Sequence, residues 1–221
     1  MIVMISIRIN KYLADKQIST RRGADLLVLE KKVFINGKLA VLGSKVSDGD
    51  KVEVRGAEKK EYLYFAYNKP IGIETNSPRI DLFPLGRLDK ASHGLLILTN
   101  DGRITDKLLN PKYIHEKEYL VRTSNKLRSN FKQKMEAGVN IEGYITQTCK
   151  VKILNDFSFR VILTEGKKHQ IRRMCANLFQ EIADLKRERI MNIKLSNLGS
   201  KSLREIKGKE LETFLKSLDM N

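Results

Sequence analysis

The sequence predicts an α+β protein in which a small basic unit precedes a larger sheet domain. Strand-like and helix-like segments alternate irregularly along the 221 residues, with no internal repeat and no low-complexity tract. A short charged stretch without an apolar pattern, residues 58–61, separates the two parts. Irregular alternation favours an α+β sheet domain over repeated strand–helix–strand units. We therefore expect domains at residues 1–57 and 62–221, joined by a linker at 58–61.

The first part is expected to open with two short helices. Apolar residues at i, i+3 and i+4 from Ile9 predict an amphipathic helix, and residues 19–20 offer an N-cap for a second one. Arg21 and Arg22 fall in the first turn of that second helix. Cations there oppose the helix dipole, at a cost of about 0.3–1 kcal/mol each when exposed. Their presence therefore suggests a contact with phosphate.

Two short strands with tight turns complete the first part. Residues 33–35 (VFI) and 52–54 (VEV) are rich in residues that favour strands. A turn signal at 36–37 (NG) follows the first of these segments, and another at 48–50 (DGD) precedes the second. These signals predict a small sheet beside the two helices.

The second part carries longer apolar patterns. Strands are expected at residues 62–67, 94–100, 118–122, 151–154, 157–163 and 190–195, with a turn at 68–72. Helices are expected at 104–109, at 131–138 with a glycine stop, from about residue 169, and over the stripe at 211–218. In the helix from residue 169, Ile171, Met174, Cys175 and Leu178 share one face, which we interpret as core.

The charge of the chain points to a polyanionic partner. It carries 42 lysines and arginines against 26 acids, a formal net charge of +16. Such an excess indicates nucleic acid or acidic lipid as the partner, or simply a basic protein. No apolar run approaches the roughly 20 residues needed to cross a bilayer. We therefore expect nucleic acid, not a membrane, to be the partner of this positive charge.

The cysteines and histidines, which are common metal ligands, are not spaced as in known metal sites. Cys149 and Cys175 are the only cysteines and form no C-x-x-C motif, while His93, His115 and His169 are scattered. We expect no metal. Two unpatterned thiols, and a start too short for a signal-peptide core, suggest a reducing, cytoplasmic location.

The most informative stretch surrounds Asp89. The sequence Gly86–Asp89 (GRLD) places a carboxylate in a polar loop, and residues 94–102 (GLLILTNDG) read as a buried strand that ends in a turn. A loop on a rigid strand can present a reactive group at a fixed place. Taken alone, such an aspartate is more often a turn-former or helix cap than a catalytic residue.

The longer motifs resolve this ambiguity by resemblance. FPLGRLDKASHGLLILTNDG, HEKEYLV and EGKKHQIRRM, together with YNKPIG and RERIMNIKLS, cover most of residues 62–196. They resemble the bacterial pseudouridine synthases of the RsuA-like family, and the EKEYLV and RIMN segments look most similar to its RluF-like branch. The resemblance implies a catalytic domain with a mixed, mainly antiparallel sheet flanked by helices.

The resemblance also implies an activity and its residues. The family isomerises uridine to pseudouridine in folded RNA; for this branch the expected substrate is 23S ribosomal RNA, with tRNA as a further one. Asp89 would attack C1′ or remove the 2′ proton, Arg172 would pair with Asp89 and orient it, and Tyr119 would stack on the extruded uracil and remove the C5 proton. The reaction needs no cofactor, which agrees with the lack of metal and phosphate-loop patterns.

The first part resembles an S4 RNA-binding domain through RINKYLADKQISTRRGAD, VFINGK and SDGDKVEV. Two departures are Gly23, where an acid usually completes the capping box, and Glu30–Lys32, where a glycine is common. A further departure is a short segment at residues 75–84, before the catalytic loop. The expected RNA contacts are Arg8, Lys11, Arg21, Arg22 and Lys38 in this part and Lys69, Arg87, Lys168, His169 and Arg173 in the second.

Two alternatives to this interpretation can be tested. Asp89 and Asp101 could form the acid pair of a glycosidase, but the intervening strand should hold them far apart. A non-catalytic RNA-binding protein with an inactive synthase fold would have the same charge, yet it could lose Asp89, Tyr119 or Arg172 without penalty. We expect a monomeric enzyme.

Overall fold

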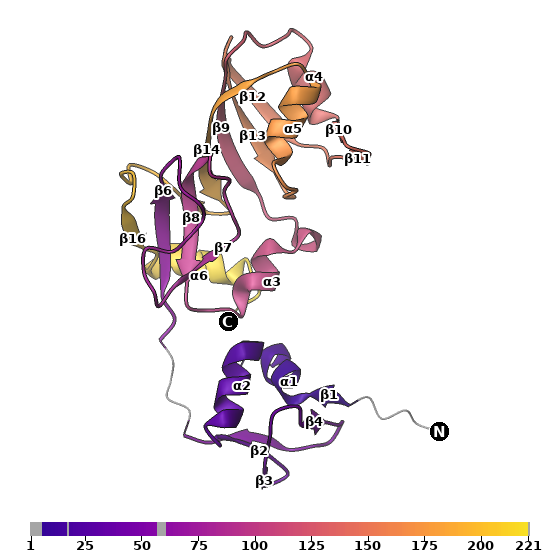
Figure 1. Cartoon of the computed structure of the whole chain (residues 1–221), viewed down its shortest axis with the longest axis vertical. Helices are drawn as coiled ribbons and strands as arrows, with labels where there is room; N and C mark the ends of the chain where they lie inside the picture. The colour runs from indigo at the N-terminus through magenta and orange to yellow at the C-terminus, as the bar shows by residue number, and fades with distance from the viewer. Residues whose placement is uncertain (1–5, 17, 57–60, 221) are drawn as a thin grey trace. The chain divides into compact units, whose positions relative to one another are not determined.

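The computed structural model describes residues 6–16, 18–56 and 61–220 (Figure 1). The chain divides into two compact units, one of residues 1–62 with 101–103 and one of residues 63–100 and 104–221. The predicted linker at 58–61 lies outside the described residues except for Glu61, so it stays a prediction.

The first unit packs two helices against short strands. Helices α1 (Ile9–Asp15) and α2 (Arg21–Leu29) both form where the sequence predicts them, and Thr20 caps α2 by accepting a hydrogen bond from the Gly23 backbone N–H at 3.0 Å. The core consists of buried apolar residues from both helices and the strands, which include Leu13, Ala24 and Val28. The strands are β1 (Ile7–Arg8), β2 (Val33–Ile35), β3 (Lys38–Leu39), β4 (Lys45–Val46) and β5 (Val52–Val54).

The strands of the first unit form two small antiparallel sheets, β1–β4 and β3–β2–β5. Strands β2 and β3 are joined by Asn36-Gly37, both with positive φ (51° and 78°). This is the backbone that a two-residue hairpin turn requires, and it is why the Asn-Gly signal predicted the turn correctly.

The second unit is built on one mixed sheet of nine strands. The strand order is β12–β13–β9–β14–β8–β6–β16, with β15 beside β14 and β7 beside β8. Only the β14–β8 pair is parallel, and every other pair is antiparallel. The strands are β6 (Tyr64–Lys69), β7 (Phe83–Leu85), β8 (His93–Thr99), β9 (Lys117–Thr123), β12 (Lys150–Asn155), β13 (Ser158–Leu163), β14 (Ile182–Ile190), β15 (Ile193–Lys194) and β16 (Leu203–Glu205). The expected α+β class, with a mainly antiparallel sheet, is confirmed.

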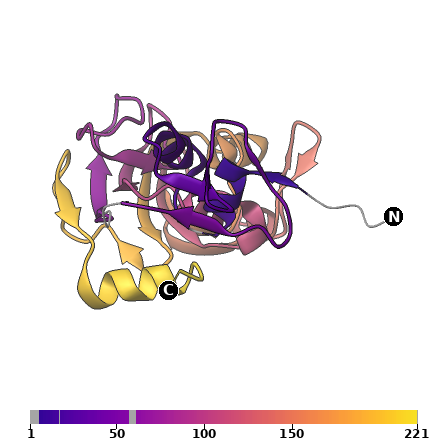
Figure 2. The same cartoon turned by 90° about the horizontal axis from the view of Figure 1, so that it is seen from below.

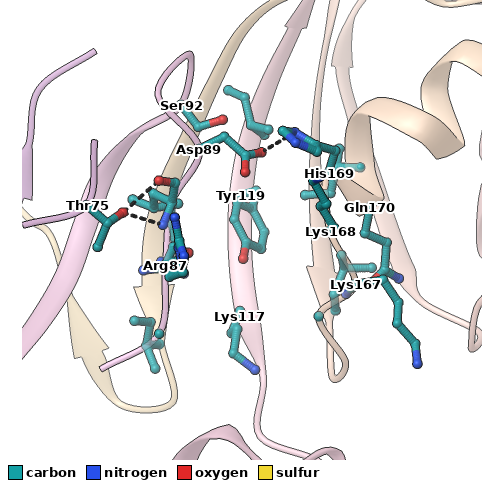
Figure 3. Close-up of a pocket in the computed structure, with 18 of the residues that line it drawn as sticks. Thr75, Arg87, Asp89, Ser92, Lys117, Tyr119, Lys167, Lys168, His169 and Gln170 are labelled. Atoms are coloured by element: carbon teal, nitrogen blue, oxygen red, sulfur yellow. Dashed lines mark hydrogen bonds and ion pairs between the residues drawn. The ribbon is translucent and has the colours of Figure 1, made fainter. Parts of the chain in front are cut away.

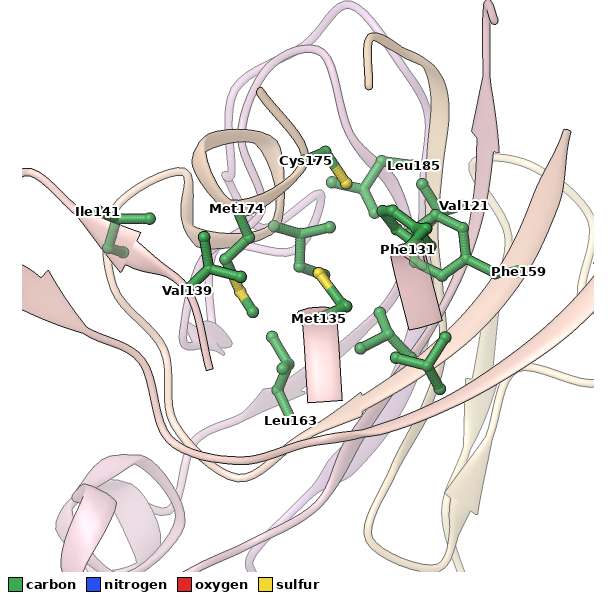
Figure 4. Packing of buried hydrophobic residues seen from close by; sticks show 13 residues of the cluster. Val121, Phe131, Met135, Val139, Ile141, Phe159, Leu163, Met174, Cys175 and Leu185 are labelled. Carbon is green, nitrogen blue, oxygen red and sulfur yellow. The ribbon is translucent and has the colours of Figure 1, made fainter. Parts of the chain in front are cut away.

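Helices cover this sheet. Helices α4 (Phe131–Glu136) and α5 (Gln170–Asn177) pack on strands β9, β12 and β13, and their buried side chains meet those of the strands in one cluster (Figures 1 and 4). Within it, Phe131 and Phe159 make an edge-to-face contact of 4.8 Å between ring centroids. The expected inner residues of α5, Met174 and Cys175, are fully buried there.

The remaining helices lie toward the other end of the sheet. They are α3 (Ile104–Leu109), the short 3-10 turn η1 (Pro111–Tyr113) and α6 (Gly208–Lys216), and a separate hairpin is formed by β10 (Asn140–Ile141) and β11 (Tyr144–Ile145). Helix α6, in yellow, lies against one side of the sheet (Figures 1 and 2). Its Phe214 is fully buried, as the apolar stripe at 211–218 predicted.

One predicted strand is wrong. Residues 190–195 do not form a single strand, because β14 ends at Ile190, Met191 has a positive φ of 51°, and β15 begins at Ile193. The eight residues of β14 that precede Ile190 were not predicted as a strand. Their run of charged residues hides the pattern, since the charges are paired across the sheet, as in the contact of Arg189 with Glu118 at 2.7 Å.

Two further features bear on function. None of the helices in the described part of the chain is long and apolar enough to cross a membrane. Within the same residues, no cluster of three or more histidines, cysteines and acids has the arrangement of a metal site.

Candidate active site

The second unit contains a pocket of about 860 Å³, within the usual size range of ligand sites (Figure 3). One wall is the loop of residues 85–90, and the facing wall is the segment of residues 165–170. The floor comes from β9 and β14, through Lys117, Tyr119, Leu185 and Arg187. The pocket therefore gathers segments that lie more than 100 residues apart in the sequence.

Asp89 lies on the first wall in a tight turn. The Ser92 N–H donates to the Asp89 carbonyl at 2.9 Å. Just before the turn, the Thr75 hydroxyl donates to the Leu88 carbonyl at 2.7 Å and accepts from the Leu88 N–H at 2.9 Å. Leu88 itself is buried. The short segment at 75–84 therefore still supplies a residue that fixes the backbone next to Asp89.

The loop joins β8 at a point of close backbone approach. Gly94 has φ of 103°, and a Cβ at this position would lie 2.4 Å from the Arg187 carbonyl oxygen on β14. Any larger residue would push apart the parallel β8–β14 pair. The glycine after the loop is thus required by packing, and it keeps the Asp89 loop close to β14.

Arg172 holds the Asp89 loop from the side of α5. Its guanidinium donates to the Ala91 carbonyl at 2.8 Å and to the Ser92 hydroxyl at 3.3 Å. The expected ion pair of Arg172 with the Asp89 carboxylate is not formed. The arginine instead holds the Ala91 backbone and the Ser92 side chain, two and three residues beyond Asp89, so in this structure it orients the acid through the loop.

The Asp89 carboxylate is paired with a residue for which the sequence suggested another role. His169 Nδ1 lies 3.1 Å from Asp89 Oδ2, with 44% of the histidine and 33% of the aspartate side chain exposed (Figure 3). His169 has a positive φ of 52° and directly precedes α5. That conformation turns its ring toward Asp89, and no sequence pattern signals it.

Tyr119 occupies the floor between the two walls. It lies in the middle of β9, where it is paired with Val161 of β13 and Arg187 of β14. Its ring is half-buried, and Figure 3 shows it beside Asp89 and above Lys117. A flat ring in this place can stack on a planar ligand.

Sequence reasoning missed two cations of the floor. Arg187 is buried; its Nε donates to the Leu95 carbonyl at 2.7 Å and one terminal nitrogen to the Arg87 carbonyl at 3.4 Å. Lys117 is half-buried, and burial, with a smaller contribution from the nearby charge of Arg187, lowers the pKa of its ammonium group. Lys117 stands in the HEKEYLV motif beside Tyr119, which was the available signal.

The second wall rests on a buried acid. Glu165 is 3% exposed and accepts hydrogen bonds from the Tyr144 hydroxyl at 2.6 Å and the Gln170 amide at 2.6 Å. These bonds hold both ends of the segment 165–170, and the four residues between them, Gly166, Lys167, Lys168 and His169, are exposed. Lys167 lies over the Tyr144 ring, 4.4 Å from its centroid.

The expected RNA contacts fall into groups. Exposed side chains without an ion pair to another described residue are Arg8, Lys11, Arg21, Arg22 and Lys38 in the first unit and Arg87 and Lys168 at the pocket. The structure corrects the assignment of Lys69. It is fully buried and its ammonium donates to the carbonyls of Pro70 and Ile73, at 3.0 and 2.7 Å, so it is out of reach of phosphate. Arg173 pairs with Glu142 at 2.5 Å on the β10–β11 hairpin.

Asp101 does not fit a second catalytic acid. Its side chain is fully buried and pairs with Arg103 at 2.8 Å. A glycosidase acid must reach both the substrate and water, and this carboxylate is enclosed by its partners. The paired-acid alternative has no structural support.

Comparison with known proteins gives a consistent result. A family model described as RNA pseudouridylate synthase matches residues 75–177. The chain is 39% identical to the dual-specificity RNA pseudouridine synthase RluF of Escherichia coli (strain K12) over 97% of this chain and 80% of that one. It is 32% identical to the ribosomal large subunit pseudouridine synthase B of Bacillus subtilis (strain 168) over 93% and 94%. A crystal structure of pseudouridylate synthase matches 96% of this chain and 99% of its own, with a TM-score of 0.69 and 26% identity.

Proposed function

The chain belongs to the RNA pseudouridine synthases, isomerases that act on RNA, and from this membership and the pocket around Asp89 we propose its substrate and its reacting residues. The substrate is a specific uridine in structured RNA, with 23S ribosomal RNA first and tRNA second. The similar enzymes of Escherichia coli and Bacillus subtilis support this choice by their names, dual-specificity and large-subunit. The observation that carries the proposal is the Asp89 carboxylate, held at the pocket wall beside the ring of Tyr119.

The reaction exchanges one bond to the sugar for another. The N1–C1′ bond breaks, the uracil turns, C5 bonds to C1′, and the C5 proton is lost while N1 gains one. No atom is added or removed overall. The pocket must therefore hold the sugar still, keep the free base from leaving, and move one proton.

Asp89 meets the first need. Its carboxylate attacks C1′ or removes the 2′ proton, and both routes require an ionised acid at a fixed position beside the sugar. The loop is fixed by Thr75, Arg172 and the buried Leu88, which leaves the carboxylate itself 33% exposed. Because His169 is paired with this carboxylate, a bound sugar must either share the carboxylate with His169 or displace the histidine.

Tyr119 meets the other needs. A uracil extruded from an RNA helix can stack on its ring, and its hydroxyl is a candidate acceptor for the C5 proton. The exposed cations of the two walls, Arg87 and Lys168, are placed to meet the phosphates on either side of the extruded nucleotide.

The experiment is to map pseudouridines by carbodiimide-stop primer extension on ribosomal RNA and tRNA from cells with and without the gene. One stop in 23S ribosomal RNA should vanish with the gene and return on complementation. A plasmid that encodes Asp89→Asn is the matched control and should not restore it. If that variant does restore the stop, Asp89 is not the reacting acid; if no stop changes, the RNA substrate lies elsewhere.

We also propose that residues 1–57 bind RNA as an S4-type domain. The support is the exposed basic group of Arg8, Lys11, Arg21, Arg22 and Lys38, with two arginines in the first turn of α2 and no acid there. A double variant Arg21→Gln/Arg22→Gln should lower the log–log salt slope of RNA affinity by about 1.4–1.8, because about 0.7–0.9 is lost per phosphate contact. An unchanged slope would remove these two residues from the interface.

We further infer a cytoplasmic monomer: both cysteines are free thiols, as a reducing compartment allows, and a single copy of the chain supplies both walls and the floor of the pocket. Sedimentation of the purified protein should give a mass near 25.4 kDa. A dimer with unchanged activity would contradict this part of the proposal alone.

A further inference from the structure

Lys117 is a cation without a partner. Among the residues that the structure describes, no hydrogen bond or ion pair is found for its ammonium group. Its strand neighbours in register are Leu163 of β13 and Ile190 of β14, which are apolar and also line the pocket. Burial and the charge of Arg187 both disfavour its charged form and so lower its pKa. The two glutamates that flank Lys117 in sequence, Glu116 and Glu118, pair with Arg189 instead. A lysine kept where its charge is costly indicates a ligand that accepts hydrogen bonds.

The position of Lys117 relative to Asp89 and Tyr119 limits what that ligand atom can be. Lys117 and Tyr119 are two residues apart on β9, so their side chains share one face, about 6.6 Å apart along the strand. In Figure 3 the Tyr119 ring lies between Asp89 and Lys117. A base stacked on Tyr119 with its sugar at Asp89 therefore directs the edge opposite the glycosidic bond toward Lys117.

In uracil the atom opposite N1 is C4, which carries the carbonyl oxygen O4. We propose that Lys117 donates a hydrogen bond to this far-edge carbonyl of the target base, and that it thereby selects uracil and stabilises the base while it is detached. This inference rests on the function proposed above and assigns the base-recognition group within the same pocket.

The proposed contact survives the turn of the base. To exchange N1 for C5 at the sugar, the ring rotates half a turn about its N3–C6 axis, and this rotation also exchanges O4 and O2. A carbonyl oxygen therefore faces Lys117 before and after the rotation. Cytosine would present an amino group in place of O4, and an ammonium group has no acceptor to offer it.

The contact also meets the charge that the reaction creates. By either route at Asp89, the N1–C1′ bond breaks with its electron pair on the base, which leaves a uracil anion with charge on N1, O2 and O4. A positive group already in place beside one of these oxygens stabilises that anion without reorganisation. Arg187, the strand neighbour of Tyr119 on β14, also lines this pocket, and its Nη2 is buried and has no partner among the described atoms. It adds positive potential to the same end of the pocket.

A phosphate is the competing occupant. The exposed residues of the rim, Arg87 and Lys168, are suited to a hydrated phosphate, whereas Lys117 lies between two apolar residues. The observations favour a neutral carbonyl that becomes negative only during reaction, so the phosphate alternative becomes an outcome of the test.

The test uses the full-length protein and a ribosomal RNA stem-loop that contains the uridine identified by mapping, with uridine, 4-thiouridine or 2-thiouridine at that site. Sulfur is a weak hydrogen-bond acceptor, so each thio substitution should slow single-turnover isomerisation by the wild type. Lys117→Met should lower the rate on the uridine substrate about tenfold or more, the usual size for a hydrogen bond to a charged group. The 4-thio and 2-thio penalties should shrink to less than threefold in this variant, because the donor is gone.

Binding and stability separate this role from the alternatives. Lys117→Met should leave RNA affinity within about threefold and the salt slope unchanged, and should not lower the melting temperature, because it removes a charge that is costly to bury. Lys117→Gln, which keeps a neutral donor, should recover part of the rate. The control is Arg122→Gln, an exposed residue on the opposite face of β9, which should leave rate and thio penalties as in the wild type.

Each contrary result has a distinct meaning. A lower salt slope with unchanged thio penalties would place Lys117 on a phosphate and overturn the inference. Equal rates for Lys117→Met and wild type would overturn it as well. If the wild type itself is inactive on the stem-loop and on whole ribosomal RNA, it is the proposed function that fails, since the inference concerns only an active enzyme.

Discussion

The two walls of the pocket are built in opposite ways. The Asp89 wall is fixed from three directions: Thr75 holds the backbone before the acid, Arg172 holds it after the acid, and Gly94 allows the loop to approach β14 closely. The facing wall is held mainly at its two ends, by hydrogen bonds of the buried Glu165 and Gln170. The residues between them are exposed, with single side-chain contacts of Lys167 to the Tyr144 ring and of His169 to Asp89.

This difference matches the demands on the two walls. A reacting carboxylate must be held within a fraction of an ångström of its productive position beside the sugar, since a displacement of about 1 Å can cost about a hundredfold in rate. A cation that meets a phosphate acts at longer range and tolerates motion. We therefore expect changes on the Asp89 wall to act on the chemical step and changes on the facing wall to act on RNA binding.

The largest effect is expected from Asp89→Asn. The amide has the same shape but is neither a nucleophile nor a base, so isomerisation should be abolished. RNA affinity should stay the same or rise slightly, because one negative charge is removed from a site that meets a polyanion. Single-turnover assays and filter binding measure the two quantities. Residual turnover within tenfold of the wild type would end the assignment of Asp89.

Neighbouring arginines on α5 provide the next test. Arg172→Lys keeps the charge, but its ammonium lies one bond short of the Arg172 Nη2 that donates to both the Ala91 carbonyl and the Ser92 hydroxyl. The rate should therefore fall about tenfold to a hundredfold at unchanged affinity. Arg173→Lys is the matched control. Its contacts are to Glu142, to the Ile141 carbonyl and, at 3.4 Å, to the Lys168 carbonyl on the facing wall, and none of them is to the Asp89 loop, so its rate should change less than threefold. Similar losses in both variants would mean that Arg172 does not act through the loop.

The same contrast shows what sequence could and could not predict. The loop and strand around Asp89 were predictable because glycines and a continuous apolar run are local signals, and β8 forms at residues 93–99 as the run indicates. Helix α3 was predicted with its observed bounds. The pairing of Asp89 with His169 was not predictable, because it depends on the left-handed backbone of His169 at 52°.

Long-range partners account for the other errors. Lys69 reads as an exposed lysine in a turn motif, but its ammonium folds back on two carbonyls inside the protein. Strand β14 was missed because its charges are satisfied across the sheet, where Arg187 and Arg189 find partners on β8 and β9. Such partners come from tertiary structure, and neither periodicity nor composition carries them.

A smaller effect is expected where the two walls meet. His169→Asn keeps a residue type that tolerates the left-handed conformation, while the shorter side chain loses the contact with the Asp89 carboxylate. An exposed pair of this kind contributes about 0.2–1 kcal/mol, so the single-turnover rate should change by no more than about fivefold. A loss above a hundredfold, with an unchanged melting temperature, would make His169 a reacting group.

The smallest effect on chemistry is expected at the rim of the facing wall. Lys168 is exposed at the pocket and has no ion pair to another described residue, so Lys168→Gln should leave the single-turnover rate at saturating enzyme within twofold. If Lys168 meets one phosphate, the log–log salt slope of RNA affinity should fall by about 0.7–0.9. Lys152→Gln, an exposed residue on β12 that does not line the pocket, is the control and should leave the slope unchanged. A lower rate at an unchanged slope would place Lys168 among the groups that act on the chemical step. That result would contradict the expectation that the facing wall acts on RNA binding alone.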